Sequence, residues 1–404
     1  MTIVFELGSS SCKVGFAGNY NPEIMFPTVV AIPKDHIFKQ MLAQPLPVKV
    51  GGQVYTGNSA GDKILVHYNV FKPIENGIIS TKKYNCFENG RIVEKSLIHH
   101  IFEYGFSNLN ISPNEIHKYS IIIPDCPSAD ENDTWGNRFT LAKIMFEDYK
   151  VPYLCIGNQG RLALLSIDLD TGIVLDCGNY KTSVTPVFEG LPIENGIKRY
   201  QLAGNNITEY LQKKLVYQKG ITSYDTPKKL RYIDEIKIKH CYVSLNYNNE
   251  EKNIQEVPIS LNGGVQSTLQ IEQIEGPELL FNPRNEETYV TKGLHEMIIE
   301  SILNSVLEIQ DCLANNIYIM GGTSQFKNFI VRTQNLLNNY LKQNSDKGFH
   351  FKKCKIHQIP DPQFAAWRGG SKIGILSDFH NFAFNRNYYM NSKDKRIIVY
   401  DKSF

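Results

Sequence analysis

The clearest pattern of apolar and polar positions is a hairpin that occurs twice. Residues 173–175 form a short apolar run that is typical of a buried strand, and a second β-rich run at 182–188 follows a turn at 177–179. The same pattern begins at 3–5, where a turn rich in glycine and serine leads to a returning run at 13–16. Two such hairpins about 170 residues apart predict a duplicated domain with a cleft between its halves.

Each hairpin carries a carboxylate at the end of its first strand. Asp176 is followed by Gly178, and Glu6 is followed by Gly8. Glycine lets the backbone turn tightly and approach a ligand closely. A carboxylate in this position suits a hydrated cation and phosphates, although a hairpin of this kind taken alone is more often purely structural.

Strand and helix signals alternate along the rest of the chain, which predicts an α/β fold. Helical periodicity is found at 94–104, 139–146, 207–215, 230–240 and 293–313. Strand signals are found at 26–33, 119–123, 241–245 and 317–320, with a hairpin at 257–271 that turns at Asn262-Gly263 and a strand-to-helix turn at Gly369-Gly370.

Two adjacent histidines are candidate metal ligands, but their spacing argues against a metal site. His99 and His100 are adjacent on the predicted helix at 94–104. Adjacent helical residues point about 100° apart, so the two rings would not bind one ion together. We expect these histidines to serve packing.

Composition narrows the class of protein. The chain has 404 residues, of which 42% are hydrophobic and 21% charged, which is enough for two domains with separate cores. A net charge of +2 gives no electrostatic case for direct binding to nucleic acid or to an anionic membrane. No apolar run is long enough to span a bilayer, and Met1 leads almost directly into a strand, so we expect no signal peptide. The eight cysteines contain no CxxC pair, which favours free thiols in a reducing compartment.

Both hairpins resemble the phosphate-binding hairpins of actin and the actin-related proteins, and further motifs follow in the order of that family. They are KPIENGII (72–79), IHHIF (98–102), KIMFEDY (143–149), LAGNNITEYL (202–211), GPELLFNP (276–283), IYIMGGTSQF (317–326) and WRGGS (367–371). The resemblance implies an actin-like α/β fold, of the superfold shared with sugar kinases and heat-shock chaperones. Two similar halves, each a mixed sheet flanked by helices, would enclose a nucleotide cleft.

The duplication and the resemblance together set the expected domain boundaries. The outer half would comprise 1–150 and 365–404, with a small inserted subdomain at about 28–72. The inner half would comprise 151–364, with an inserted subdomain at about 203–290.

The resemblance also implies a nucleotide site. Its cofactor-binding residues would be Gly8, Ser9, Lys13, Asp176, Gly178, Gly204, Lys237, Gly321, Gly322 and Thr323. Lys13 would pair with the β- and γ-phosphates, and Asp176 would order the water shell of Mg²⁺. The expected cofactor is ATP or ADP with Mg²⁺; the residues leave open whether it is bound.

Several positions depart from the family pattern where hydrolysis takes place. Lys143 replaces the glutamine that orients the attacking water, and a charged lysine has no acceptor for a proton of that water. The other replacements are Glu6 and Asn179 for aspartates, Ser10 and Tyr180 for glycines, Ser183 for histidine, Ile238 for the glutamate that holds the ribose, and Asp234 for a basic residue. Because phosphoryl transfer depends on positioning and electrostatics, we predict no efficient hydrolysis and assign no catalytic residue.

These features predict a divergent actin-related protein. It would be a non-catalytic structural or adaptor subunit of a larger cytoskeletal, axonemal or chromatin-associated assembly, binding ATP at most without efficient hydrolysis. Its partners would be other protein subunits, actin and actin-related proteins among them, in the cytoplasm, with cilium and nucleus left open. Altered loops at 36–52 and 282–292 argue against polymerisation. The alternative is an ATP-hydrolysing, filament-forming actin; the actin-type motifs make a sugar kinase remote.

Overall fold

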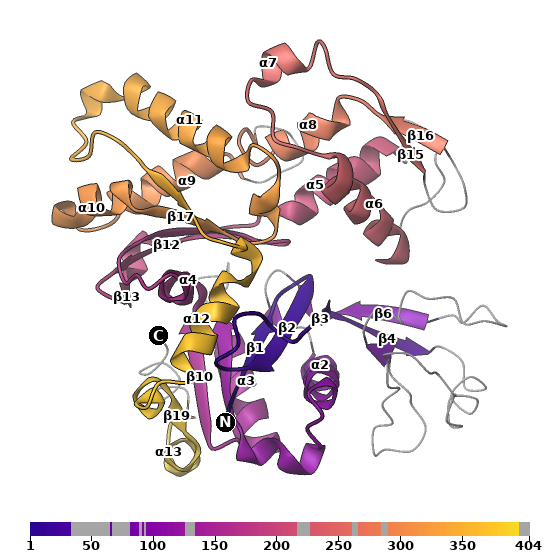
Figure 1. Cartoon of the computed structure of the whole chain (residues 1–404), viewed down its shortest axis with the longest axis vertical. Helices are drawn as coiled ribbons and strands as arrows, with labels where there is room; N and C mark the ends of the chain where they lie inside the picture. Colours follow the sequence, from indigo (N-terminus) through magenta and orange to yellow (C-terminus); the bar gives the residue numbers. More distant parts are fainter. Residues whose placement is uncertain are drawn as a thin grey trace. The chain divides into compact units, whose positions relative to one another are not determined.

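The computed structural model describes residues 1–33, 65–66, 81–88, 91–92, 94–125, 134–215, 227–260, 266–283 and 290–395. The chain divides into two compact units (Figure 1). Unit 1 comprises Met1–Asn158 and Gly370–Phe404, and unit 2 comprises Gln159–Gly369. The loop at 36–52, the turn at 262–263 and residues 284–289 of the loop at 282–292 lie outside the described residues.

Unit 1 is built on a six-stranded sheet in the order β19-β10-β9-β1-β2-β3. These strands are β1 (Thr2–Leu7), β2 (Ser11–Phe16), β3 (Ile24–Pro27), β9 (Ser120–Asp125), β10 (Tyr153–Asn158) and β19 (Phe384–Asn385). Its helices are α2 (Lys95–Asn108), α3 (Thr134–Lys143), which continues into a π-helical turn at Ile144–Asp148, and α13 (Arg386–Asn391). The remaining strands form a sheet in the order β5-β4-β6 and a pair β7-β8. They are β4 (Val29–Pro33), β5 (Leu65–Val66), β6 (Thr81–Asn85), β7 (Phe87–Glu88) and β8 (Arg91–Ile92).

An aromatic cluster joins α2 to the sheet of unit 1. The ring of Phe5 on β1 lies 4.6 Å from that of Phe102 and 5.7 Å from that of Phe106, both on α2. Gly105 lies between them in the helix, and a Cβ there would come within 2.5 Å of the Phe5 ring. The missing side chain lets α2 pack directly on the strand that carries Glu6.

Unit 2 is built on a second sheet, in the order β13-β12-β11-β17-β18, with β14 also pairing with β12. Its strands are β11 (Gly172–Cys177), β12 (Thr182–Phe188), β13 (Leu191–Pro192), β14 (Lys198–Tyr200), β17 (Ile317–Met320) and β18 (Ile356–Gln358), with a separate hairpin of β15 (Val257–Ser260) and β16 (Gln266–Leu269). Its helices are α4 (Gln159–Ser166), α5 (Gly204–Lys213), α6 (Pro227–His240), α7 (Tyr247–Glu250), α8 (Glu272–Glu278), α9 (Leu294–Leu303), α10 (Gln310–Asn315) and α11 (Phe329–Gln343), while α12 (Ala365–Ile373) continues into unit 1.

The two sheets repeat one topology. In unit 1 the run β2-β1-β9-β10 has an antiparallel hairpin, then two parallel neighbours. In unit 2 the run β12-β11-β17-β18 has the same order and the same directions. The predicted α/β fold and both predicted hairpins are therefore confirmed.

Two predicted elements differ from the structure. Residues 241–245 form no strand, because the N–H groups of Tyr242 and Val243 donate to the carbonyls of Gln273 (3.1 Å) and Lys327 (3.0 Å) instead of to a neighbouring strand. The helix expected over 293–313 is interrupted between α9 and α10. The Gln310 amide donates to the carbonyls of Leu303 (3.3 Å) and Ser305 (3.1 Å), which replaces helical bonds at the break.

Gly369 and Gly370 also differ from expectation, because they lie inside α12 and not at a strand-to-helix turn. A Cβ on Gly369 would come within 1.8 Å of the Leu162 carbonyl oxygen on α4. The glycine therefore permits a close approach between two helices of unit 2.

Two other kinds of feature are absent from the part of the chain that the structure describes. No described helix is both long and apolar enough to cross a membrane. No three described histidine, cysteine or acidic side chains gather as they would around a metal ion.

Candidate functional site

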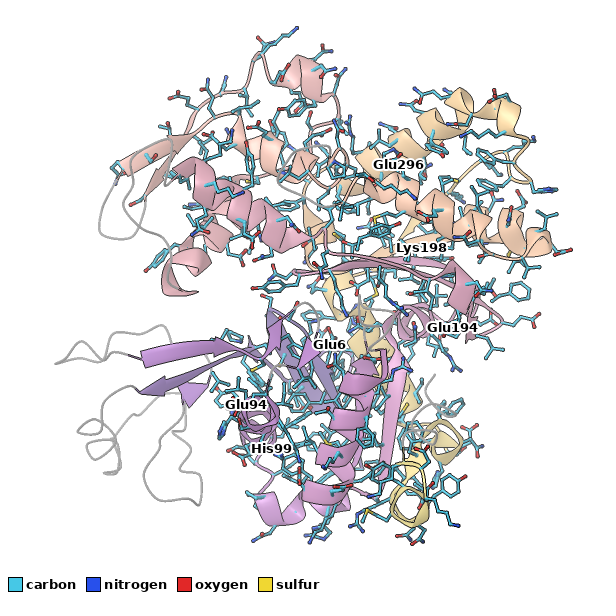
Figure 2. All side chains as sticks on the ribbon, turned by 180° about the vertical axis from the view of Figure 1, so that it is seen from behind. Glu6, Glu94, His99, Glu194, Lys198 and Glu296 are labelled. Carbon is cyan, nitrogen blue, oxygen red and sulfur yellow. The ribbon has the colours of Figure 1, made fainter. Side chains whose placement is uncertain are left out.

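The first hairpin places Glu6 directly opposite Lys13 in the β1–β2 ladder. Both residues are buried, and their side chains form an ion pair (Figure 2 labels Glu6). Oε2, the second carboxylate oxygen of Glu6, is buried without a hydrogen-bond partner among the described residues. Lys13 would therefore have to share its ammonium between Glu6 and any phosphate that it binds.

The turn of this hairpin is held by Thr28. The Thr28 hydroxyl donates to the Gly8 carbonyl at 2.5 Å, and its backbone N–H donates to the Ser10 carbonyl at 3.0 Å. A Cβ on Gly8 would lie 2.4 Å from the Ser11 carbonyl oxygen, so the turn needs glycine there. Ser9 is half-buried in the same turn and Ser10 is exposed.

The second hairpin has the same register but a different cross-strand partner. Asp176 lies opposite Ser183, as Glu6 lies opposite Lys13. Ser183 is buried and neutral, so it cannot neutralise a carboxylate as a lysine does. The two hairpins therefore keep their carboxylates in equivalent places, one opposite a charged residue and the other opposite a neutral one.

Three of the predicted residues of unit 2 meet around one carbonyl group. The Gly178 oxygen accepts hydrogen bonds from the Gly204 N–H (3.2 Å) and the Thr323 hydroxyl (2.6 Å). The next carbonyl, of Asn179, accepts from the Asn205 N–H at 2.6 Å. These bonds join the turn of the second hairpin to the first turn of α5 and to the turn after β17, and they use N–H groups at the start of α5.

The glycines after β17 bring the backbone close to Asp176. Gly321 has φ +97°, a region that favours glycine, and a Cβ there would lie 2.7 Å from Asp176 Oδ1. A Cβ on Gly322 would meet nothing within 4 Å. This part of unit 2 fits phosphates and a hydrated Mg²⁺. The two glycines have no side chains that would keep a phosphate from the backbone N–H groups, and the Asp176 carboxylate suits the hydrated cation.

Lys237 lies in the same unit but is fully engaged within it. Its ammonium donates to the Gly204 carbonyl (3.1 Å) and to the Thr208 hydroxyl (2.9 Å), and it forms an ion pair with Asp234. A lysine ammonium has three N–H donors, so this set uses all of them. Ile238, the next residue, has 70% of its surface exposed and offers no polar group. At this end of the site the Lys237 donors are therefore already used, and Ile238 adds no polar group.

Tyr180 lies in the turn of the second hairpin, which is bonded to the start of α5 through the Asn179 carbonyl. Its pKa is raised, first because burial disfavours the phenolate and then because of the negative charges of Glu209 on α5 and Asp234 on α6. The phenol is half-buried. The tyrosine thus adds a bulky, half-buried side chain to the turn that contacts the start of α5.

Lys143, at the position expected to orient water, ends α3 with an exposed side chain. It offers donors only, so it cannot accept a proton from water while charged.

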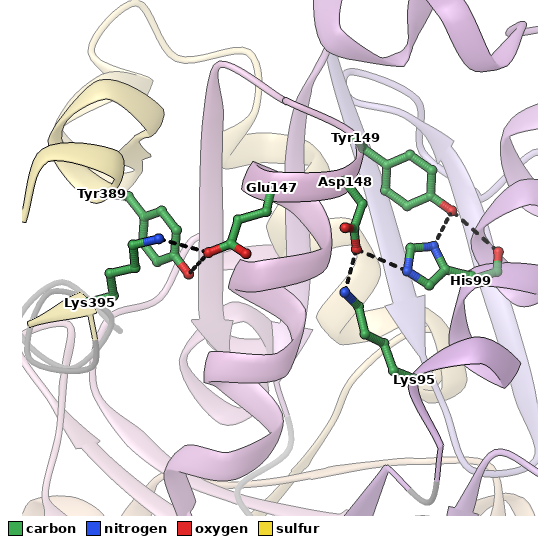
Figure 3. Close-up of polar contacts among 7 residues, drawn as sticks. All are labelled: Lys95, His99, Glu147, Asp148, Tyr149, Tyr389 and Lys395. Atoms are coloured by element: carbon green, nitrogen blue, oxygen red, sulfur yellow. Dashed lines mark hydrogen bonds and ion pairs between the residues drawn. The ribbon is translucent and has the colours of Figure 1, made fainter.

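The residues that follow Lys143 form two polar clusters in unit 1 (Figure 3). In one, the Asp148 carboxylate lies 3.0 Å from His99 Nε2 and 2.6 Å from Lys95 Nζ. In the other, Glu147 accepts hydrogen bonds from Lys395 (2.8 Å) and Tyr389 (3.4 Å).

Sequence reasoning missed these clusters, which tie α2 and the C-terminal segment to the π-helical turn. The adjacent Glu147, Asp148 and Tyr149 were a usable signal, since adjacent residues at the end of a helix point in different directions and can contact different elements. Burial lowers the pKa of His99 despite Asp148 nearby, and His99 Nδ1 lies 3.2 Å from the Tyr149 hydroxyl. His99 serves packing and hydrogen bonding.

Comparison with known proteins agrees with this geometry. The model of the actin family matches residues 1–402. Putative actin-29 from Dictyostelium discoideum is 30% identical over 408 aligned residues, which cover 98% of this chain and 95% of that relative. Both matches run through the two hairpins and the segments that surround them. The chain therefore belongs to the actin family.

Proposed function

We propose that this actin-related chain is a non-catalytic structural or adaptor subunit of a larger cytoskeletal, axonemal or chromatin-associated assembly in the cytoplasm. The observation that carries the proposal is the internal engagement of Lys237, whose three donors are all used within unit 2. A site whose polar groups already satisfy one another gains little from a nucleoside, because binding must first break those bonds.

The nucleotide part of the proposal follows from the same site. Asp176 and the bare backbone at Gly321 and Gly322 would hold Mg²⁺ and phosphates, while Lys237 and Ile238 offer no free polar group to a ribose. ATP or ADP with Mg²⁺ would then bind weakly, mainly through its phosphates. Hydrolysis would be slow for two reasons. The charged Lys143 cannot accept a hydrogen bond or a proton from the attacking water, and Ser183 has no imidazole to position that water.

The test is the adenine nucleotide content of gently purified protein together with phosphate release on adding Mg-ATP. We expect little bound ADP and phosphate release at the background rate, unchanged in an Asp176→Ala variant. Near one mole of ADP per mole of protein, with release abolished by Asp176→Ala, would overturn the non-catalytic role.

The retained glycines favour one second candidate, an ATP-hydrolysing, filament-forming actin. Gly8, Gly204 and Gly321 all keep close approaches that a side chain would block. Salt-induced sedimentation of the protein together with phosphate release would establish this alternative.

A further inference from the structure

Several exposed lysines lie in unit 2 at the end of α11 and in the connection that follows it. Figure 1 shows the course of this connection. We name residues 342–355 the lysine segment. It carries five exposed lysines against one acidic residue, Asp346; the lysines are Lys342, Lys347, Lys352, Lys353 and Lys355. The whole chain has a net charge of only +2, so the remainder is net acidic and the positive charge is concentrated here.

These lysines are not neutralised by their surroundings. No ion pair within the described ranges of the chain involves any of the five. Like charges held close together repel one another, and an anionic partner would relieve that repulsion.

The lysine segment is also held in place by its apolar residues. Phe351 and Cys354 are buried in the core of unit 2, and Phe349 stacks on Phe351 with ring centres 5.5 Å apart. The Lys355 N–H donates to the Ala314 carbonyl at 2.9 Å, and the Gln334 amide donates to the Cys354 carbonyl at 2.8 Å. Because the backbone is anchored, a partner would not bear the cost of ordering it.

We propose that the lysine segment is a docking surface for an acidic segment of a partner protein. Two observations select this class among anionic partners. The aromatic rings at 349 and 351 pack inward and offer no platform for stacking bases. The segment has no exposed large apolar side chain to insert into a bilayer.

This inference rests on the proposed role as a subunit of an assembly, because it names the chemistry of one subunit contact. Its test does not involve nucleotide, so the two proposals fail separately. Phosphate release and sedimentation decide the role of the chain, whereas the binding of an acidic peptide decides the role of the lysine segment.

The experiment measures fluorescence anisotropy of a labelled peptide of about twelve glutamates with the full chain, at about 50 mM and about 200 mM salt. We expect saturable binding that weakens about tenfold at the higher salt, because the contacts are exposed and screened. The variant Lys347→Glu/Lys352→Glu/Lys353→Glu should lose about tenfold or more in affinity at low salt.

A matched control keeps total charge equal. The variant Lys150→Glu/Lys252→Glu/Lys393→Glu reverses three exposed lysines elsewhere and should change affinity less than about twofold. Equal losses in both variants, or no binding to the wild-type chain, would overturn the proposal. Tighter binding of single-stranded DNA or of phosphatidylserine vesicles, lost in the first variant, would replace it with that partner class. If the triple variant does not fold, Lys352→Gln/Lys353→Gln provides the same comparison by removing charge without reversing it.

Discussion

Asp234 and Lys237 form an ion pair one turn apart on α6, and this pair helps to decide what Lys237 can contact. Asp234 also accepts a hydrogen bond from the Thr208 hydroxyl at 2.8 Å, so one carboxylate organises both neighbours. Lys237 in turn bonds to Gly204 and Thr208 on α5, so these contacts stabilise α5 against α6.

Removing the carboxylate should therefore release a donor. We expect Asp234→Ala to bind Mg-ATP several-fold more tightly than the wild-type chain, because one hydrogen bond of about 1 kcal/mol becomes available to the nucleotide. Titration calorimetry measures the affinity directly. The exposed Asp311→Ala on α10 is the charge-matched control and should have no effect. Identical affinities in all three proteins would show that Lys237 does not limit binding.

The buried pair of Glu6 and Lys13 makes a prediction about stability. Glu6→Gln leaves the Lys13 ammonium buried without a charge partner, which should cost about 3–5 kcal/mol of unfolding free energy. Urea unfolding followed by a probe in unit 1 measures the loss. The double variant Glu6→Gln/Lys13→Met should recover much of it, since no unpaired charge remains. A double variant as unstable as the single one would mean that the pair itself carries the stability.

Gly369 makes a prediction about packing. Gly369→Ala places a methyl group 1.8 Å from a backbone oxygen of α4, which cannot move as a side chain can. We expect a loss of about 1–3 kcal/mol or more, seen as a lower thermal midpoint. Gly322→Ala is the matched control, because a Cβ there meets nothing within 4 Å. Equal midpoints for the two variants would contradict the close helix approach.

His295 makes a prediction about pH. Burial, chiefly, and Arg332 lower its pKa in the folded chain, while Glu296 opposes them. The unfolded chain then takes up the proton first, so the contribution of His295 to stability is complete above about pH 6.5 and is lost as the pH falls below it. Urea midpoints at about pH 7.5 and about pH 5.5 should differ less in His295→Gln than in the wild-type chain.

The exposed His117→Gln serves as the control for this pH dependence and should keep the wild-type difference. A His295→Gln variant with an unchanged difference would assign the acid sensitivity to other groups.

Local patterns explain which parts of the fold the sequence could predict. The two hairpins were predictable because their apolar runs and glycine turns depend on neighbouring residues only, and the shared ladder register of Glu6 and Asp176 follows from equal spacing. The break between α9 and α10 was not predictable, because it depends on the Gln310 side chain reaching back to Leu303 and Ser305. Gly369 was misplaced for a similar reason, since its neighbour Leu162 is distant in sequence.

The candidate site was predictable in part. Spacing placed glycines beside Asp176, and the structure brings Gly321 there. The three bonds of Lys237 were not predictable, because two acceptors come from α5 and the choice between ligand and internal partner depends on distances. The negative charges of Glu209 and Asp234 near Tyr180 likewise depend on the arrangement of α5 and α6.

The discontinuity of unit 1 has a consequence for synthesis on the ribosome. Strand β10 ends at Asn158, but its neighbour β19 and the fully buried Tyr389 are made more than two hundred residues later. At ~5–20 residues per second, the first part of unit 1 waits roughly 10–40 s until its last strand has been synthesised. Unit 2, in contrast, is one continuous stretch of the chain. During that interval β10 presents an open edge to other chains in a crowded cell. Newly made molecules should therefore depend on chaperones until translation is nearly finished.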